Sequence, residues 1–186
     1  MIVVYLVADT GSRRTYRGFT VDLAQRLRRH RKEIRGGARY TSRFRGCRLL
    51  AYVRGFQTQR QALSFEWFTK GRRVRAYRPV PQVPAKLSRL VSPCLVRKFK
   101  PWLPELTVVV DETYCSARGQ QALTRRYGVA VQRRSLSHEN FTVEDWRQLA
   151  AWLKHRVPTR AAARLVWQYS TTRPWLAGTP TFIRSA

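Results

Sequence analysis

Acidic residues are scarce in this chain. Its 186 residues hold only 10 Asp and Glu against 37 Lys and Arg, which gives a formal net charge of +27 at pH 7. Such an excess of one sign repels itself unless an anionic partner neutralises it. Nucleic acid is the usual partner of a basic chain rich in aromatic residues. A membrane surface is the weaker candidate, because no basic amphipathic helix stands out.

Cysteine pairs and long hydrophobic runs are also missing. The three cysteines stand far apart and no CxxC motif occurs, which argues against a disulfide framework and against a structural zinc site. No apolar run approaches the length of a membrane span, and the N-terminal run 2–8 has the pattern of a strand rather than of a signal peptide. These absences favour a reducing compartment, nuclear or cytoplasmic.

Short strand and helix patterns alternate over the first 76 residues. Two runs rich in β-branched and aromatic residues flank turn residues, which predicts an antiparallel hairpin. Cap and stop signals place two helices after it. The expected elements are strands over 2–7, 15–19 and 49–53, a helix that begins at a Thr20 cap and ends at Gly36-Gly37, and a helix from a Thr58 capping box to Phe68.

The composition changes near Tyr77. Six of the nine prolines lie within 77–104, a density that forbids long helices and central strands. This stretch is therefore expected to be a linker or a wrapping segment, with a short helix near 87–91. Residues 105–186 are expected to form a basic α+β region of unknown role, with strands near 106–110 and 129–131 and helices near 116–127 and 143–155.

Five side chains of the first part, residues 1–76, form a candidate site. Tyr5 and Tyr16 lie on the two strands of the expected hairpin. Arg26 and His30 are four residues apart and so share one face of the first helix. Glu66 is a lone acid among aromatic residues of the second helix, where a carboxylate is costly unless it pairs with a cation or a metal ion.

These side-chain types suit the cleavage of a phosphodiester bond. Arg26 would neutralise charge on the phosphoryl oxygens, and His30 would move a proton near neutral pH. Mg²⁺ (or Mn²⁺) held by Glu66, water and a substrate phosphate would satisfy the acid. A hairpin phenol would orient or deprotonate the attacking water. Each residue also has a structural interpretation: strand tyrosines usually belong to the core, runs of arginine are commonly solvated, and the acid could pair with a nearby arginine.

The order of these motifs resembles that of the GIY-YIG nuclease superfamily. Within it, the similarity is greatest to the Slx-type structure-selective endonucleases, which cut branched DNA. The resemblance covers residues 2–76 and is carried by Val4-Tyr5-Leu6, Thr15-Tyr16-Arg17-Gly18-Phe19-Thr20, Arg26 with His30, Gly36-Gly37-Ala38-Arg39-Tyr40-Thr41, Gly55-Phe56 and Phe65-Glu66-Trp67. It implies an α+β fold with a small three-stranded antiparallel sheet flanked by helices, and a divalent metal ion at Glu66. It also implies that Gly18 is the motif glycine, where a side chain would crowd the hairpin.

The sequence departs from the family pattern at several points. Val3 replaces the first motif glycine, Arg17 stands in the middle of the second motif, and Arg31 stands where an asparagine commonly follows the helical histidine. The Slx-type nucleases carry a zinc-binding RING-like domain after the nuclease, and its ligands are missing here. Whether the chain also docks to a protein scaffold is therefore an open question.

The sequence as a whole predicts a metal-dependent endonuclease that hydrolyses DNA, with branched, flapped or otherwise distorted duplex as substrate. Gly18 and four arginines would contact the nucleic acid: Arg28, Arg39, Arg43 and Arg45. The alternative is a non-catalytic basic protein that binds or packages nucleic acid on the same scaffold, and a third option is a nuclease that cuts RNA. A compact basic nuclease would also suit a large DNA virus or a mobile element.

Overall fold

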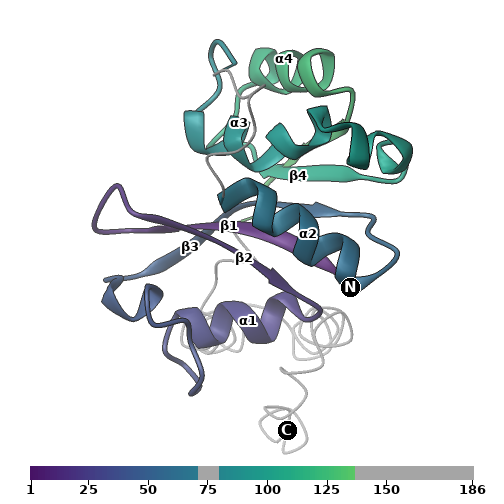
Figure 1. Ribbon diagram of the computed structural model, residues 1–186. Helices are drawn as coiled ribbons and strands as arrows, with labels where there is room; N and C mark the ends of the chain where they lie inside the picture. Colours follow the sequence, from purple (N-terminus) through teal and green to yellow (C-terminus); the bar gives the residue numbers. More distant parts are fainter. Residues whose placement is uncertain (71–79, 137–186) are drawn as a thin grey trace, which may run out of the picture. The chain divides into compact units, whose positions relative to one another are not determined.

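A mixed sheet of five strands is the framework of the protein (Figure 1). The computed structural model describes residues 1–70 and 80–136. The strands lie in the order β2-β1-β3-β4-β5, and all neighbours are antiparallel except the parallel pair β4 and β5. Their bounds are Val3–Asp9 (β1), Thr15–Thr20 (β2), Cys47–Arg54 (β3), Thr107–Asp111 (β4) and Ala130–Arg134 (β5).

The α+β class is confirmed, but the sheet is larger than the three strands expected. Strands β2, β1 and β3 form the expected antiparallel unit, and β4 then pairs with β3 through contacts such as Tyr52 with Val109. The backbone groups along that edge of β3 need hydrogen-bond partners, and the buried run Val108–Val110 supplies an apolar strand for them. The family motifs end before β4, so they gave no sign of this extension.

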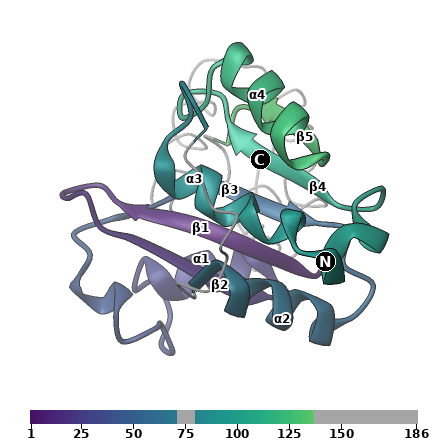
Figure 2. The ribbon, with the colours of Figure 1, turned by 45° about the horizontal axis from the view of Figure 1, so that its top comes forward.

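Helices cover both faces of the sheet (Figures 1 and 2). Helix α1 (Leu23–His30) packs on one face, which we call the α1 face. Helices α2 (Gln59–Lys70), α3 (Ala85–Val91) and α4 (Ala117–Tyr127) pack on the other, the α2–α4 face. Among the described residues, no helix is long and apolar enough to cross a membrane.

The bounds of α1 differ from the expectation at both ends. Asp22, not Thr20, caps the helix: its Oδ1 accepts a hydrogen bond of 2.9 Å from a first-turn backbone N–H, because a carboxylate satisfies an orphan donor there. The helix ends at His30, before the glycine pair. Just beyond it, Lys32 adopts a positive φ of 66°, a conformation in which a right-handed helix cannot continue.

The other helix signals agree with the structure more closely. The Thr58 capping box is confirmed: the N–H of Gln61 donates to Thr58 Oγ1 at 3.2 Å, and the N–H of Thr58 donates to Gln61 Oε1 at 3.3 Å. Ser116 caps α4, which ends at a left-handed Gly128. The helix expected over 143–155 lies outside the described residues.

The proline-rich stretch from Val80 onward packs into the core. It forms α3 and two 3-10 helices, η2 (Ser92–Leu95) and η3 (Arg97–Trp102). Leu87, Leu90 and Phe99 are fully buried in the apolar cluster on the α2–α4 face. The prolines therefore break this segment into short helices that cover the sheet without requiring central strands.

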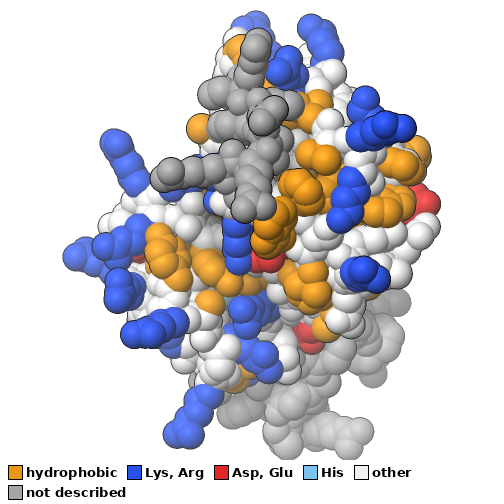
Figure 3. Space-filling view, in the orientation of Figure 1, with side chains coloured by type: hydrophobic (Ala, Val, Ile, Leu, Met, Phe, Trp, Pro, Cys, Tyr) orange, Lys and Arg blue, Asp and Glu red, His pale blue; other side chains and the backbone are white. Residues whose placement is uncertain are grey.

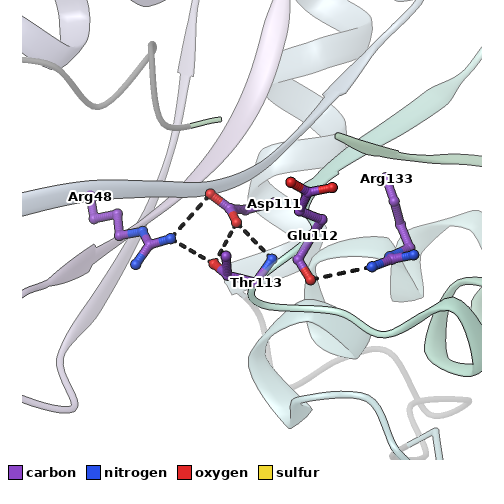
Figure 4. Close-up of polar contacts among 5 residues, drawn as sticks. All are labelled: Arg48, Asp111, Glu112, Thr113 and Arg133. Carbon is purple, nitrogen blue, oxygen red and sulfur yellow. Dashed lines mark hydrogen bonds and ion pairs between the residues drawn. The ribbon is translucent and has the colours of Figure 1, made fainter. Parts of the chain in front are cut away.

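A polar cluster joins β4 to its neighbours (Figure 4). Arg48 on β3 donates through Nη2 to Asp111 Oδ2 at 3.3 Å and to Thr113 Oγ1 at 2.6 Å. Arg133 on β5 donates to the carbonyl of Glu112 at 3.4 Å. Burial alone would raise the pKa of Asp111, but its hydrogen bonds to Thr113 and Arg48 outweigh burial and hold the pKa below the usual value. The cluster thus satisfies a buried carboxylate where the strands meet.

Candidate active site

The hairpin of β1 and β2 places both motif tyrosines on the α1 face. Tyr5 lies opposite Gly18 and Tyr16 lies opposite Val7, and the two phenol rings are 6.3 Å apart. A Cβ at Gly18 would fall on the Tyr5 hydroxyl, 2.7 Å from Tyr5 Cζ and 2.9 Å from Tyr16 Cε1. The glycine is therefore required because a tyrosine hydroxyl occupies the space that any larger residue would need.

Helix α1 brings Arg26 and His30 to the Tyr5 hydroxyl. Arg26 Nε donates to Tyr5 Oη at 3.0 Å, and Tyr5 Oη lies 2.7 Å from His30 Nε2. Leu23 and Leu27 anchor the helix in the core below. The spacing of four residues thus places both polar side chains on one phenol, as the helical repeat requires.

Thr41, at the start of 3-10 helix η1 (Thr41–Arg43), fixes the tautomer of His30. Its Oγ1 donates to the carbonyl of Ala38 at 2.9 Å and lies 2.7 Å from His30 Nδ1. The hydroxyl proton is used at the carbonyl, so Oγ1 must accept a hydrogen bond from a protonated Nδ1. Nε2 then carries no proton and accepts the hydrogen bond from Tyr5. Burial, reinforced by Arg26 and Arg31, lowers the pKa of His30 to about 4.

The two phenols differ in their access to solvent. Tyr5 is fully buried, whereas Tyr16 is partly exposed. Burial raises the pKa of Tyr5 well above its usual value, although the hydrogen bond from Arg26 opposes the shift. In the unbound protein the proton of Tyr5 therefore stays on the phenol and points at His30 Nε2. Tyr16 forms the outer wall of the same site.

Glu66 on α2 pairs with a lysine that lies over the Tyr16 ring. Its carboxylate forms an ion pair with Lys70 one turn further along the helix, and its side chain is 14% exposed. The Lys70 ammonium lies 5.4 Å from the centre of the Tyr16 ring. Phe65 turns into the core while Trp67 is exposed. Glu66 thus lies partly buried at the border of the apolar stripe, and the ammonium that pairs with it faces the Tyr16 ring.

The donor set near Glu66 fits a hard divalent ion held mainly by water and substrate. Within residues 1–70 and 80–136, no group of three or more His, Cys, Asp or Glu side chains could form an all-protein metal cage. Mg²⁺ commonly takes one or two carboxylates and completes its shell with water and phosphate oxygens. The Lys70 ammonium already forms an ion pair with this carboxylate, so a positive charge is stabilised at this position.

The predicted nucleic-acid contacts lie at the surface, with one exception. Arg39, Arg43 and Arg45 are exposed, and blue Lys and Arg side chains are scattered over the face shown in Figure 3. Arg28 instead pairs with Glu33 at 3.5 Å and is only partly exposed. The role of these arginines in binding nucleic acid stays a prediction, and Arg28 begins with part of its charge already neutralised.

Sequence reasoning missed three residues of this site. Thr41 holds the histidine, Lys70 neutralises the acid, and the half-exposed Tyr40 stacks on Tyr16 with ring centres 6.2 Å apart. A signal existed for Lys70, because a spacing of four residues between Glu and Lys favours a helical ion pair. Tyr40 and Thr41 lay inside a motif but had no partner that the sequence could name.

Comparisons with known proteins identify relatives of the first part of the chain. Residues 1–77 match the GIY-YIG catalytic domain. The chain is 50% identical over 56 residues (30% of this chain, 20% of the relative) to the structure-specific endonuclease subunit slx1 of Schizosaccharomyces japonicus. It is 44% identical over 64 residues (33% and 18%) to the SLX1 homolog of Giardia intestinalis. It is 34% identical over 129 residues (61% and 18%) to that of Leishmania infantum. The match thus spans about a fifth of each relative's length.

Proposed function

Residues 1–77 of this chain belong to the GIY-YIG family, and from this premise we propose that the protein is a metal-dependent endonuclease that hydrolyses DNA phosphodiester bonds. The observation that carries the proposal is the hydrogen-bonded chain Arg26–Tyr5–His30–Thr41 beside Tyr16. The Glu66–Lys70 pair faces the Tyr16 ring. A protein that only coats nucleic acid needs positive charge but has no use for a histidine of fixed tautomer or for a border carboxylate.

Arg26 acts on the phosphate in this proposal. Its guanidinium has the two phenols, Tyr5 and Tyr16, as neighbours, so its charge stands at the outer edge of the network. A cation held there before the reaction stabilises the charge that develops on phosphoryl oxygens without having to move. The cost of orienting it is already met by the hydrogen bond to Tyr5.

The proton of the attacking water leaves through the phenols toward His30 Nε2, the acceptor at the inner end of the network. In the unbound protein this nitrogen is a weak base, since burial lowers the pKa of His30 to about 4. An anionic phosphate bound nearby stabilises the imidazolium and so strengthens the base. A relay through Tyr5 moves one proton in as another moves out, so no phenolate has to form.

Glu66 is the residue that would hold Mg²⁺ or Mn²⁺. When bound, the ion would polarise the phosphoryl group and help to orient water. Lys70 would then give up its ion pair with Glu66.

The substrate we propose is DNA with branched, flapped or otherwise distorted structure. The relatives carry the description of structure-specific endonuclease subunits, and the exposed Arg39, Arg43 and Arg45 would hold the backbone beside the site. The word subunit in those names supports a protein scaffold as a further partner of this chain. The three cysteines are free and buried, which suits a nuclear or cytoplasmic compartment.

One experiment tests the proposal. The full chain is incubated with Mg²⁺ on nicked, flapped and four-way DNA, and on the same structures made of RNA, beside Glu66→Gln and an EDTA control. We expect cleavage of the branched DNA that is lost in the variant while binding persists. If DNA binds but none of the structures is cut by the wild-type chain, the protein is a binder. If only RNA is cut, the substrate assignment is wrong.

A further inference from the structure

A small basic pocket lies at the C-terminal end of α1. It has a volume of about 270 Å³ and is lined by His30 and by Thr41, the residue bound to His30 Nδ1. This volume is slightly below the range of about 300–1,000 Å³ typical of sites for drug-sized ligands. The space therefore suits a unit about as large as a phosphodiester group rather than a whole nucleotide.

Of the described residues, three cations and no acid line the pocket. They are Arg29, Lys32 and Arg35. Arg29 Nε is buried and has no hydrogen-bond partner within the described residues. A buried N–H without a partner is rare in folded proteins and costs free energy, so it points to an acceptor that binds there. A guanidinium accommodates phosphate oxygens with its paired donors better than an ammonium does.

Two glycines form the wall beside Arg29. Gly36 has a φ of +96°, and a Cβ placed on it would lie 3.7 Å from Arg29 Nε. A Cβ on Gly37 would lie 2.6 Å from the Arg29 carbonyl oxygen, which is too close for any side chain. The loop after α1 therefore approaches the guanidinium as bare backbone, and neither glycine places a side chain in the pocket beside Arg29.

The end of a helix is an unfavourable place for an anion unless its carbonyls are satisfied. Here three of the last four carbonyls are occupied: that of Leu27 accepts from Arg31 at 2.9 Å, that of Arg28 from Glu33 at 3.0 Å, and that of Arg29 from Lys32 at 3.2 Å. The negative end of α1 is thus screened by its own loop, and the three cations dominate the pocket.

We propose that this pocket binds a backbone phosphate of the nucleic acid strand, separate from the phosphate that is cleaved at Tyr5 and Glu66. The inference rests on the proposed function and adds a second anchoring point for the same strand. Arg29 supplies the fork, and Lys32 and Arg35 supply further charge. His30 belongs to both sites, so the pocket fixes the strand beside the catalytic network.

The test follows the backbone amides of Gly36 and Gly37 by NMR in the ¹⁵N-labelled full chain. The chain is titrated with a flapped oligodeoxynucleotide and, separately, with inorganic phosphate. Arg29→Gln is compared with Arg125→Gln, which removes the same charge from an exposed position on α4. Arg29→Lys keeps the positive charge but removes the paired donors of the guanidinium. It shows whether a variant that keeps the charge also keeps the binding.

We expect the oligonucleotide to shift both glycine amides in the wild type and in Arg125→Gln. Arg29→Gln should lose these shifts and weaken binding about tenfold, as expected for one charge-assisted hydrogen bond. Arg29→Lys should fall between the wild type and Arg29→Gln. DNA binding that leaves both amides unmoved, or equal behaviour of Arg29→Gln and Arg125→Gln, would overturn the subsite. If inorganic phosphate shifts the glycine amides but the oligonucleotide does not, the pocket takes free oxyanions, and the assignment to nucleic acid is overturned.

The same samples separate this inference from the proposed function. Glu66→Gln should keep the glycine shifts although it cannot cleave. Shifts in a wild-type chain that cuts no DNA support the subsite and refute the endonuclease. Cleavage by a chain whose pocket amides never move supports the endonuclease and refutes the subsite.

Discussion

The two faces of the sheet are packed with different chemistry. The α2–α4 face is apolar, with Phe65 packed edge-on against Phe56 and Phe99 at ring distances of 5.3 and 5.2 Å. The α1 face instead buries a phenol and an imidazole that are hydrogen-bonded to each other. Strand β1 contributes to both, because successive side chains point to opposite faces. Leu6 therefore packs in the apolar cluster while its neighbour Tyr5 joins the hydrogen-bonded network of the α1 face.

This contrast shows how one sheet can bury apolar side chains on one face and hydrogen-bonded polar side chains on the other. Burial of a polar side chain destabilises a protein only when its partners are missing, and the α1 face supplies a partner at each step of its network. Changes on the α2–α4 face should therefore act through lost packing. Substitutions on the α1 face should act by leaving buried polar groups without a hydrogen-bond partner. They should affect catalysis even where the loss of stability is small.

The largest effect on stability is expected on the apolar face. Phe65→Ala should lower the free energy of unfolding by about 3–5 kcal/mol, because it leaves a cavity beside the rings of Phe56 and Phe99. Urea denaturation measures the change. Leu63→Ala on the same helix is the matched control, since Leu63 is 47% exposed and should cost about 0.5 kcal/mol or less. Equal losses in the two variants would refute the assignment of Phe65 to the core.

The next largest effect is the loss of stability in acid that the buried His30 on the α1 face should cause. The pKa of folded His30 is lowered from 6.5 to about 4, so the unfolded chain takes up this proton first. The stabilisation that comes from keeping His30 neutral is complete above pH 6.5 and is lost as the pH falls toward 4. The slope is at most about 1.4 kcal/mol per pH unit.

NMR titration of the folded protein checks this directly. His30 should stay neutral through pH 5 with the proton on Nδ1, and His30→Gln should show a weaker fall of stability between pH 7 and pH 5. A midpoint for His30 near its ordinary value would contradict the buried, Thr41-bound tautomer.

A smaller loss of stability, but a complete loss of activity, is expected for Tyr5→Phe. The variant keeps the ring and removes the hydroxyl, which leaves His30 Nε2 and Arg26 Nε without their partner. The cost should be about 1–3 kcal/mol for such buried groups. Tyr40→Phe is the control, because Tyr40 is half exposed and should change stability by about 0.5 kcal/mol or less. A Tyr5→Phe protein that still cleaves at the wild-type rate would exclude this phenol from the proton path.

The smallest effect concerns Lys70. Lys70→Met removes the cation that pairs with Glu66 and should tighten Mn²⁺ binding to the DNA-free chain up to about fivefold, the value of one exposed ion pair. Electron paramagnetic resonance of free Mn²⁺ gives the affinity. Lys86→Met removes a distant ammonium that donates to the Arg13 carbonyl and should change nothing. Weaker Mn²⁺ binding in Lys70→Met would show that Lys70 supports the metal site rather than competing for it.

Local signals predicted most elements of the fold. The Thr58 box begins α2, and runs of apolar residues, β-branched in β1 and β4, mark β1, β3 and β4. Capping and strand preference act between near neighbours in the chain. The cap of α1 was assigned wrongly to Thr20. Thr20 and Asp22, on either side of Val21, can each accept from a backbone N–H, and only the three-dimensional path of the chain selects Asp22. The five-stranded sheet was missed for a related reason. Pairing of β3 with β4 joins residues far apart in sequence, which no local pattern encodes.

The family motif identified Tyr5, Tyr16, Arg26, His30 and Glu66 as a group, but their roles stay predictions. Sequence could not reveal that Tyr5 is buried while Tyr16 is partly exposed, or that Thr41 dictates the histidine tautomer. Each of these depends on distances between separate elements, and such distances are set by packing.

The order of residues alone determined the charge, the α+β class, the hairpin and the spacing that sets Arg26 and His30 on one helix face. Those properties follow from composition and from the repeats of helix and strand, which are local. Tertiary structure decided which proton sits on which atom, which acid stands at the surface, and where a basic pocket opens beside the histidine. Hydrogen bonding and desolvation act between side chains brought together only by folding, so these features exist in the folded protein and nowhere in the linear pattern.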